Sequence, residues 1–384
     1  EIDDVPEGTW VSHIEPSKHD GAVAYVVMDD HRRGNWEPYL YRTDDYGEDW
    51  ENLGRNEGVD GRDRGIDGFL HTVEEDPVTP NLLFAGGQLG LFVSVDMGES
   101  WFKWTHGFPT VPVRSLVVHP RDHDLVIGTH GRAIWILDDI RPLRAIAADP
   151  LVMLETVHLF ETPDAYARYT AAVDGYHFSG DGVFQGERRP EGALLTYWLN
   201  RDSEEVVTVT VRSEDGTVVK TIDAPGDHGL NRISWDLRED VPGADEEGGG
   251  FFEMDAPQAL PGTYSVTVLA HGMEVTEPLT VLADPRVEIA IEERFQRHTA
   301  VTEAYVLSHR VASIARAAEE AFGSVARLFE LDLERRIPLI VFKNHAEFAV
   351  TNAVDLPTYS DYIGGVTELF KNRIAIPFVG DYRD

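Results

Sequence analysis

Short apolar stretches alternate with polar turn sequences through the first 140 residues. The stretches are rich in Val, Leu, Ile, Tyr and Phe, and they lie at residues 22–28, 39–42, 82–85, 91–95, 114–118 and 125–127. Gly, Asp, Asn and Pro gather between them. Runs of this length, bounded by turn-forming residues, predict β-strands. The first part of the chain is therefore predicted to be all-β.

Two turn sequences in this region end in tryptophan. Residues 43–50 and 94–101 follow the pattern S/T-x-D-x-G-x-T/S-W, and Asp49 is the one departure from it. The Asp of such a turn can bind neighbouring backbone amides, the Gly supplies a positive φ, and the Trp can pack against an adjoining sheet. We therefore predict a structural role, and no catalytic role, for Asp45, Gly47, Trp50, Asp96, Gly98 and Trp101.

A longer repeat surrounds these turns. An acidic residue or a histidine precedes proline at residues 15–16, 76–77 and 119–120, so the prolines are 61 and then 43 positions apart. One four-stranded propeller blade takes about 40 to 50 residues. Polar insertions at about residues 30–37 and 55–65 account for the longer interval. We predict three β-propeller blades over residues 1–140, and we expect the missing propeller blades upstream because closure needs about four to eight.

The pattern changes after residue 140. Residues 141–191 are rich in Pro and Gly and are predicted to form a linker. Period-two alternation then runs through 193–199, 205–212, 218–222, 231–237, 262–270 and 274–282, with a hairpin turn at residues 214–216. This pattern predicts an Ig-like β-sandwich of about seven strands over residues 192–284.

The last hundred residues, 285–384, are predicted to hold a helical segment and a truncated α/β piece. Apolar residues recur at helical spacing between 287 and 329, and an apolar strand is expected at 337–342. His345 and Glu347 are two positions apart, which does not suit the i, i+4 geometry of a zinc helix, so His345 is expected to be an ordinary surface residue. Glu368 is likewise expected to be a loop carboxylate. The predicted fold class is mainly β, with a partial β-propeller, an Ig-like β-sandwich and a C-terminal α/β segment.

Composition narrows the classes of function. The chain has 68 acidic and 33 basic residues and a net charge of −35, which argues against a nucleic-acid partner. It has no cysteine, and no apolar run is long enough for a membrane span. No cofactor and no metal site are predicted. A calcium-binding acidic surface stays an alternative, although no D-x-D-x-D-G loop is present.

These motifs resemble known families. The tryptophan turns resemble the Asp-box of sialidases, other propeller glycoside hydrolases and sortilin-like receptors. Residues 112–120 and 128–139, with 38–43, resemble the C-terminal half of bacterial sortilin-like or BNR-repeat glycosyl hydrolases. Residues 229–237 and 260–264 resemble the Ig-like domain of flagellar hook-cap proteins, and residues 364–378 resemble the start of a peptidase MA-like (gluzincin) domain. The resemblance implies an extracytoplasmic protein, periplasmic or secreted.

Candidate binding residues come from the last predicted blade, because polar residues at strand ends can face a propeller channel. They are His130, Arg132, Asp138 and Asp139. The leading hypothesis is a non-catalytic exported fragment that binds protein or glycan. A propeller glycoside hydrolase, sialidase-like, without its catalytic blades is the second hypothesis. An accessory part of a truncated zinc metallopeptidase is the third.

Overall fold

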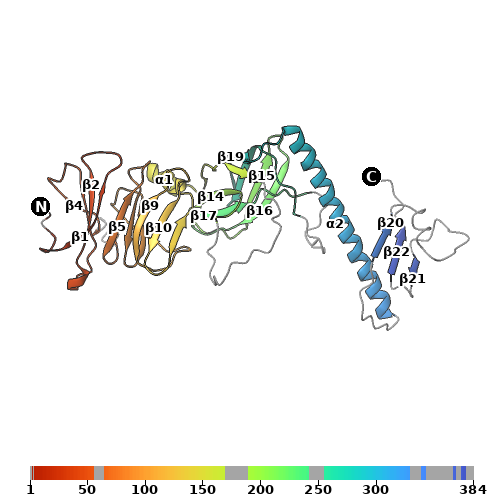
Figure 1. Cartoon of the computed structure of the whole chain (residues 1–384), viewed down its shortest axis with the longest axis horizontal. Coiled ribbons are helices and arrows are strands. Elements are labelled where there is room, and N and C mark those ends of the chain that lie inside the picture. The colour runs from red at the N-terminus through yellow and green to blue at the C-terminus, as the bar shows by residue number, and fades with distance from the viewer. Residues whose placement is uncertain are drawn as a thin grey trace, which may run out of the picture. The chain divides into compact units, whose positions relative to one another are not determined.

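The computed structural model describes residue 2, residues 4–55, 65–168, 189–241 and 255–328, and the backbone of three further strands. The chain divides into two compact units, and each is described by itself. The first unit takes residues 1–237 and 259–288, and the second takes residues 238–258 and 289–384. The described chain is mainly β, as the sequence predicts (Figure 1).

Three antiparallel sheets open the first unit, and each joins strands that follow one another in the chain. Sheet 1 has the order β1-β2-β3-β4, sheet 2 the order β5-β6-β7-β8, and sheet 3 the order β11-β10-β9. The bounds are β1 (Trp10–Pro16), β2 (Ala24–Asp29), β3 (Tyr39–Thr43), β4 (Glu51–Asn52), β5 (Leu70–Glu75), β6 (Leu83–Gly87), β7 (Gly90–Ser94), β8 (Phe102–Trp104), β9 (Val113–Val118), β10 (Leu125–Thr129) and β11 (Ile134–Leu137).

Sheet 2 is packed on both faces, which explains why its strands β6 and β7 read as nearly continuous apolar runs. Successive side chains of a strand point to opposite faces. Leu83 and Ala85 of β6 join a core with sheet 1, whereas Phe84 between them joins a core with sheet 3. In β7, Leu91 packs toward sheet 3 and Phe92 toward sheet 1. Sheet 2 therefore lies between the other two.

The first strands of the three sheets, β1, β5 and β9, lie next to one another. Pairing registers place the beginnings of these three strands at one end of the sheets and the two tryptophan turns at the other. We call these the bulge end and the box end. The bulge end comprises the beginnings of β1, β5 and β9 and the loops 30–38, 88–89 and 130–133. The box end comprises the loops 17–23, 44–50, 76–82, 95–101, 119–124 and 138–140.

Residues predicted as a linker, 141–191, contain regular structure in their described part. They hold α1 (Arg141–Ala148), the 3-10 helix η2 (Pro150–Leu154), β12 (Val157–Leu159) and β13 (Ala165–Ala167). β12 pairs with β14 and β13 pairs with β19, so both strands belong to the sandwich that follows. Their brevity explains why alternation did not reveal them, since three residues carry almost no period-two signal.

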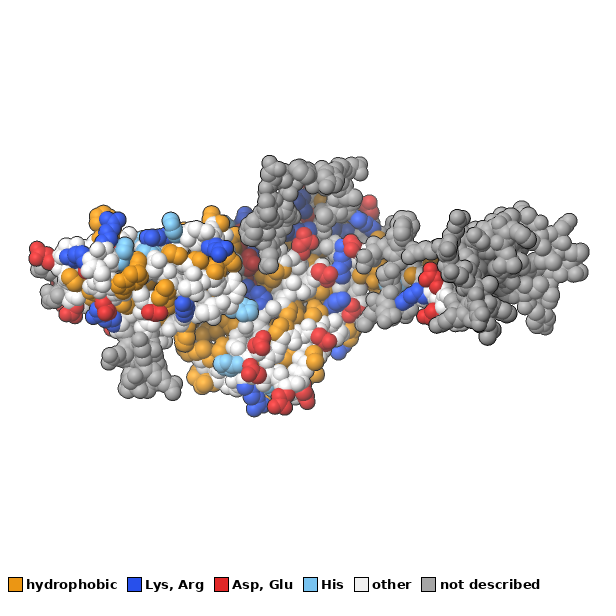
Figure 2. Space-filling view, turned by 90° about the horizontal axis from the view of Figure 1, so that it is seen from below, with side chains coloured by type: hydrophobic (Ala, Val, Ile, Leu, Met, Phe, Trp, Pro, Cys, Tyr) orange, Lys and Arg blue, Asp and Glu red, His pale blue; other side chains and the backbone are white. Residues whose placement is uncertain are grey.

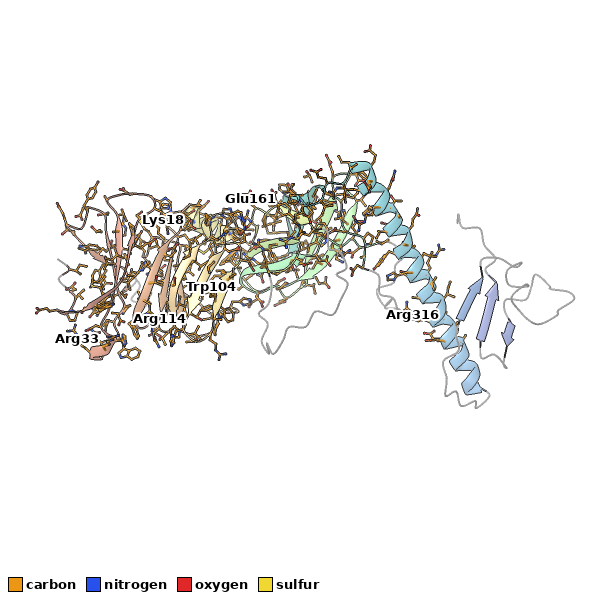
Figure 3. All side chains as sticks on the ribbon, in the orientation of Figure 1. Lys18, Arg33, Trp104, Arg114, Glu161 and Arg316 are labelled. Carbon is orange, nitrogen blue, oxygen red and sulfur yellow. The ribbon has the colours of Figure 1, made fainter. Side chains whose placement is uncertain are left out.

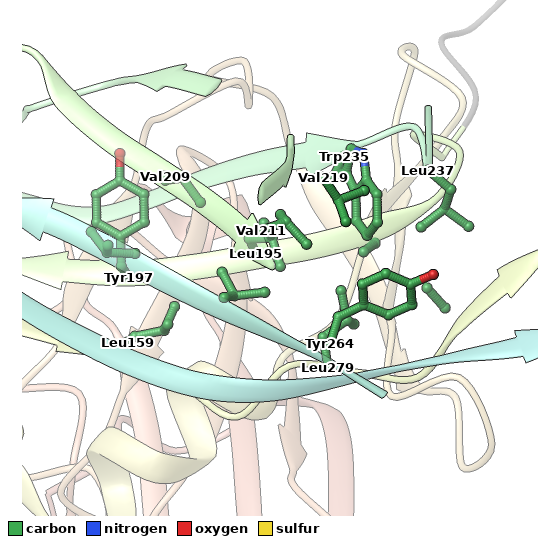
Figure 4. Packing of buried hydrophobic residues seen from close by; sticks show 14 of the residues in the cluster. Leu159, Leu195, Tyr197, Val209, Val211, Val219, Trp235, Leu237, Tyr264 and Leu279 are labelled. Carbon is green, nitrogen blue, oxygen red and sulfur yellow. The ribbon is translucent and has the colours of Figure 1, made fainter. Parts of the chain in front are cut away.

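The sandwich consists of two facing sheets, with the orders β12-β14-β17 and β13-β19-β18-β15-β16. Inward residues of both sheets form one core around Tyr197, Trp235 and Tyr264 (Figure 4). Gly216 has φ +86 and its N–H donates to the Ser213 carbonyl, as expected for the predicted hairpin turn. The remaining bounds are β14 (Ala193–Leu199), β15 (Val207–Ser213), β16 (Val218–Ala224), β17 (Gly229–Trp235), β18 (Gly262–Ala270) and β19 (Met273–Ala283).

The second unit contains a 38-residue helix, α2 (Ile291–Leu328), and a small sheet. The sheet has the order β20-β22-β21, with β20 (Leu339–Phe342) parallel to β22 (Arg373–Pro377) and β21 (Val366–Glu368) antiparallel to it. His345 and Glu347 lie outside the described residues, and Glu368 is described only as the last residue of β21. The peptidase-like interpretation of this segment therefore stays a prediction.

Candidate functional site

Each of the three adjacent first strands carries one extra residue near the bulge end. In β1 the pairing passes from Val11 to His13 and leaves out Ser12. In β5 it passes from Leu70 to Thr72 and leaves out His71, and between β9 and β10 it leaves out Arg114. A bulge re-aims the side chain of its extra residue, and bulges are common beside functional sites. Ser12, His71 and Arg114 therefore occupy equivalent positions on three neighbouring strands.

His71 and Arg114 are in direct contact. Arg114 Nη1 donates to His71 Nδ1 over 3.2 Å, and His71 Nε2 lies 3.4 Å from Gln88 Oε1. Because a guanidinium only donates, the imidazole accepts at Nδ1 and carries its proton at Nε2. Burial and the neighbouring Arg114 charge lower the pKa of His71 to about 4. The ring is therefore neutral near pH 7, and it does not offset the arginine's charge.

Aromatic rings form a layer beside this pair. The His31 ring stacks on Phe69 with centroids 4.4 Å apart, and Trp36 meets Phe69 edge-on at 5.1 Å. Phe69 meets His71 edge-on at 5.0 Å, so the layer is continuous with the polar pair. Phe69 is 2% exposed but Trp36 is 55% exposed. One face of an indole thus remains available at the protein surface.

The loop that carries His31 and Trp36 is held by side-chain hydrogen bonds. Asp29 binds His31 Nδ1 at 2.6 and 2.7 Å, which leaves Nε2 as the outward nitrogen of that ring. Asp30 accepts from Arg33 Nε at 2.5 Å, and Gly34 ends the short helix η1 (His31–Arg33) with φ +80. These contacts fix a loop that the sequence predicted only as an exposed polar insertion.

Arg33 and Arg114 lie at the same lower end in Figure 3, whereas Lys18 lies at the opposite end. Figure 2 views the molecule from below that orientation and therefore faces the bulge end, where basic and histidine side chains lie among exposed hydrophobic side chains and some acidic ones. The site is a mixed aromatic and basic surface on a strongly acidic protein.

The four residues predicted from the sequence separate into two pairs. His130 and Arg132 are exposed in the β10–β11 turn, at the bulge end, where the His130 N–H donates to the Pro112 carbonyl. Asp138 and Asp139 follow β11 at the box end. Asp139 is buried, and its carboxylate accepts from Arg141 Nε at 2.6 Å. The two pairs therefore lie at opposite ends of strand β11.

Both aspartates also take part in docking the sandwich. Arg232 of β17 donates to the carbonyl oxygens of Asp138 and Asp139, the second over 2.7 Å. Burial raises the pKa of the Asp138 carboxyl group. The backbone that holds these carboxylates is therefore fixed by the sandwich, which is a structural use of the segment.

The two tryptophan turns have matching hydrogen bonds. Thr43 and Ser94 each donate a hydroxyl to the turn aspartate, at 2.8 and 2.7 Å, and each accepts from the glycine N–H. Asp45 also accepts from the Asp49 N–H, and this bond is the main reason why the pKa of the Asp45 carboxyl group is lowered. The Ser100 hydroxyl adds a bond to Asp96 that the side chain of Asp49 cannot donate. The carboxylate oxygens of both aspartates therefore accept hydrogen bonds from within their own turns.

Two carboxylates at the box end have their pKa values shifted apart. Burial raises the pKa of Glu74; for Glu15, burial acts in the same sense but is outweighed by hydrogen bonds with His13 and Lys18, which lower the pKa. Such a contrast is found in acid–base catalysis. Here, however, Lys18 Nζ occupies the space between them, at 2.8 Å from Glu15 and 3.0 Å from Glu74. The arrangement leaves no room for a substrate between the two acids.

The described residues contain no group of three or more His, Asp or Glu side chains that could hold a metal ion. Among the helices that the structure describes, none is both long and apolar enough to cross a membrane.

Sequence reasoning missed the residues at the centre of the bulge end, namely Ser12, His31, Trp36, Phe69, His71, Gln88 and Arg114. The predicted binding residues flank the last strand of the third repeat, whereas Arg114 lies near the beginning of the first strand of that repeat and His71 at the equivalent position of the second repeat. The contact of residues 31 and 36 with residue 69 had no signal in the sequence.

Comparisons with known proteins are limited. No protein-family model matches the chain, and no curated protein matches it. Among solved structures, an ancestral GH74 enzyme is similar over 33% of this chain and 14% of its own, with 17% identity and a TM-score of 0.25. PorZ, a surface component of the type-IX secretion system of Porphyromonas gingivalis, is similar over 71% of this chain and 30% of its own, with 11% identity and a TM-score of 0.29.

A third structure, the extracellular domain of a hybrid two-component system from B. thetaiotaomicron, is similar over 72% of this chain and 32% of its own, with 10% identity and a TM-score of 0.27. The chain thus spans about a third or less of each of these three structures. At these scores the likeness carries no argument about the chemistry of this chain.

Proposed function

We propose that the chain is part of an extracytoplasmic β-propeller protein that binds a glycan at the bulge end and performs no catalysis there. The observation that carries this proposal is the exposed indole of Trp36, which is fixed against Phe69 beside three re-aimed bulge residues. Sugar rings present apolar C–H faces that pack on aromatic rings, while their hydroxyl groups need donors and acceptors. Gln88, whose N–H donates to the Phe69 carbonyl, and His31, whose ring stacks on Phe69, provide such groups around the residue that Trp36 contacts.

In this proposal the three sheets are propeller blades. Each sheet is formed by strands that follow one another in the chain, the first strands of the three sheets are adjacent, and neighbouring sheets share a core. These features fit a repeat of propeller blades. Val117, Ile134 and Ile136 are exposed on the face of sheet 3 that points away from sheet 2. Of these three residues, Ile134 is 69% exposed. Their counterparts on sheet 2, Leu91 and Val93, are covered by sheet 3. A further blade packed on sheet 3 would bury this apolar face in the same way.

The sandwich is proposed to be an Ig-like spacer that holds sheet 3 rigidly. Leu230 of β17 packs into the core between sheets 2 and 3, and Trp198 of β14 packs with Ile146 of α1. The Trp198 indole N–H donates to the Met153 carbonyl over 3.2 Å. Apolar contacts and hydrogen bonds of this kind limit movement between the sheets and the sandwich.

The alternative of a propeller glycoside hydrolase has less support in the described residues. Hydrolysis of a glycoside commonly uses two carboxyl groups about 5 to 9.5 Å apart with a sugar between them. Among the described acids at the bulge end, Asp29 and Asp30 are bound to His31 and Arg33, and Glu37 is paired with Arg55 over 2.7 Å. Turnover of aryl-glycosides by the purified chain, lost on Asp29→Asn, would favour the hydrolase over the binding protein.

The binding proposal is tested with a matched pair of aromatic variants. Trp36→Ala removes the exposed indole at the bulge end, and Tyr46→Ala removes an aromatic side chain that is 84% exposed at the box end. Immobilised neutral and acidic oligosaccharides are screened with the wild-type chain. We expect Trp36→Ala to abolish the signals that the wild type gives and Tyr46→Ala to preserve them. Equal loss in both variants, or signals that survive Trp36→Ala, would contradict the location of the site.

A further inference from the structure

Arg114 differs from the arginines of sheet 1 that are paired with acids. The chain has about twice as many acids as bases, so its arginines usually find a carboxylate, as Arg33, Arg42 and Arg55 do in or beside sheet 1. Arg114 instead donates to the neutral ring of His71. Among the described residues, no acidic side chain lies within ion-pair distance of it. Its charge is therefore uncompensated locally.

The geometry of Arg114 leaves donors available. The guanidinium group has five N–H donors in a planar fork, which suits two parallel hydrogen bonds to a carboxylate. One contact, from Nη1 to His71, fixes the side chain, and the residue is exposed to solvent. Asp29, an acid at the bulge end, is held by His31. A ligand can therefore approach Arg114 without displacing an internal ion pair.

The apolar part of the site is adjacent. His71 contacts both Arg114, at 3.2 Å, and the ring of Phe69, at 5.0 Å between centroids, and Phe69 in turn holds Trp36. A ligand that spans this short chain of contacts meets a cation on one side and an indole face on the other. A sugar ring with a carboxylate substituent has both of the complementary features in one residue.

We propose that the glycan bound at the bulge end is acidic, and that the carboxylate of a hexuronate residue binds Arg114 while a sugar ring of the glycan packs on Trp36. This inference rests on the proposed function, because it names the ligand class of the same site. The protein's net charge of −35 repels anions at long range, but at 0.15 M salt the screening length is only about 8 Å. Short contacts with Arg114 therefore decide the affinity.

The test compares an oligogalacturonate with the same oligosaccharide after reduction of its carboxyl groups, by calorimetry at 0.15 M salt. We expect the wild type to bind the acidic form about ten-fold or more tightly than the reduced form, the scale of a charge-assisted hydrogen-bond pair. Arg114→Gln should remove this preference and leave the weaker binding of the reduced form unchanged. Arg121→Gln, a change of an exposed arginine at the box end, is the matched control and should change neither affinity.

The outcomes separate the two proposals. Equal binding of both forms by the wild type would overturn the acidic ligand and leave glycan binding in place. Binding of neither form, together with no glycan signal in the screen, would overturn both. Tighter binding of an acidic peptide or of inorganic phosphate than of the oligogalacturonate, lost in Arg114→Gln, would show an anion site for a different ligand class. Circular dichroism of each variant excludes loss of folding as the cause.

Discussion

Replacement of Trp101 tests how the tryptophan turns stabilise the stacked sheets. Trp101 is 6% exposed and lies in the core between sheets 1 and 2. Its indole N–H donates over 3.0 Å to the carbonyl of Leu53, a residue of the preceding repeat. Trp50 occupies the same position of the first turn but is only half-buried, and its N–H donates to Gly47 within its own turn. The pair therefore separates contact between sheets from contact within a turn.

The expected magnitudes follow from these differences. Trp101→Ala removes a buried aromatic side chain and should lower the free energy of unfolding by about 3 to 5 kcal/mol. Trp101→Phe keeps most of the packing but loses the hydrogen bond to Leu53, and it should lower the free energy of unfolding by about 1 kcal/mol. Trp50→Ala, as the matched control, should cost about 1 kcal/mol. Urea unfolding of the three variants, followed by circular dichroism at 222 nm and 230 nm, measures the differences.

Two results would refute this reasoning. If Trp50→Ala and Trp101→Ala cost the same, the turn itself would be the stabilising unit and the contact with Leu53 would be irrelevant. If Trp101→Ala left stability unchanged but removed glycan binding, the residue would belong to a binding site. The structure predicts neither result, because Trp101 lies near the box end and is covered by sheet 1.

Three further predictions concern charge. Burial lowers the pKa of His71 from its ordinary 6.5 to about 4, so between pH 6.5 and 4 the unfolded state binds a proton that the folded state does not. The free energy of unfolding should therefore fall by up to about 3 kcal/mol as the pH drops from 6.5 to 4, and His71→Gln should flatten that part of the pH profile. Arg144→Met leaves the buried carboxylate of Asp76 unpaired and should lower the free energy of unfolding by about 3 to 5 kcal/mol, whereas Arg121→Met, in an exposed pair, should lower it far less; chemical denaturation distinguishes them. Sodium and potassium chloride should raise the melting temperature equally by screening the net charge of −35, most strongly near neutral pH, and a rise with millimolar calcium at constant ionic strength would instead indicate a calcium site.

Much of the first unit could be predicted because its signals are local. Residues 193–199 and 262–270 alternate over seven to nine positions, and the structure places β14 and β18 at the same bounds. Strands β1, β4, β5 and β8 were not identified: β5 has His and three polar residues among its six, and β4 and β8 have only two and three residues. The three-residue strands β12 and β13 depend on pairing with β14 and β19, which are distant in sequence. Local patterns cannot report such pairing.

The candidate site was harder to predict, because its residues are equivalent only in three dimensions. The sequence marks the box end, where Asp, Gly and Trp recur in a fixed order. At the bulge end the equivalent positions hold Ser12, His71 and Arg114, three different residue types without a shared pattern. A repeat keeps the residues that hold its backbone and is free to vary those that do not. Recurrence in the sequence therefore pointed to the structural turns.

The two ends of the sheets differ in how far their polar groups are satisfied, and this difference favours the bulge end as the functional one. At the box end, Glu75 accepts from Ser17, from the Lys18 N–H and from Tyr25, while the fully buried Asp76 binds Arg144 through both oxygens. Such bonds stiffen the sheets but leave little capacity for a ligand. At the bulge end, Arg114 keeps its charge uncompensated by any described acid and Trp36 keeps an indole face exposed. A ligand can pair with a charge that no described acid compensates, and it can pack on a ring face that stays exposed. The bulge end offers both, and the bonds at the box end keep the backbone of the sheets rigid.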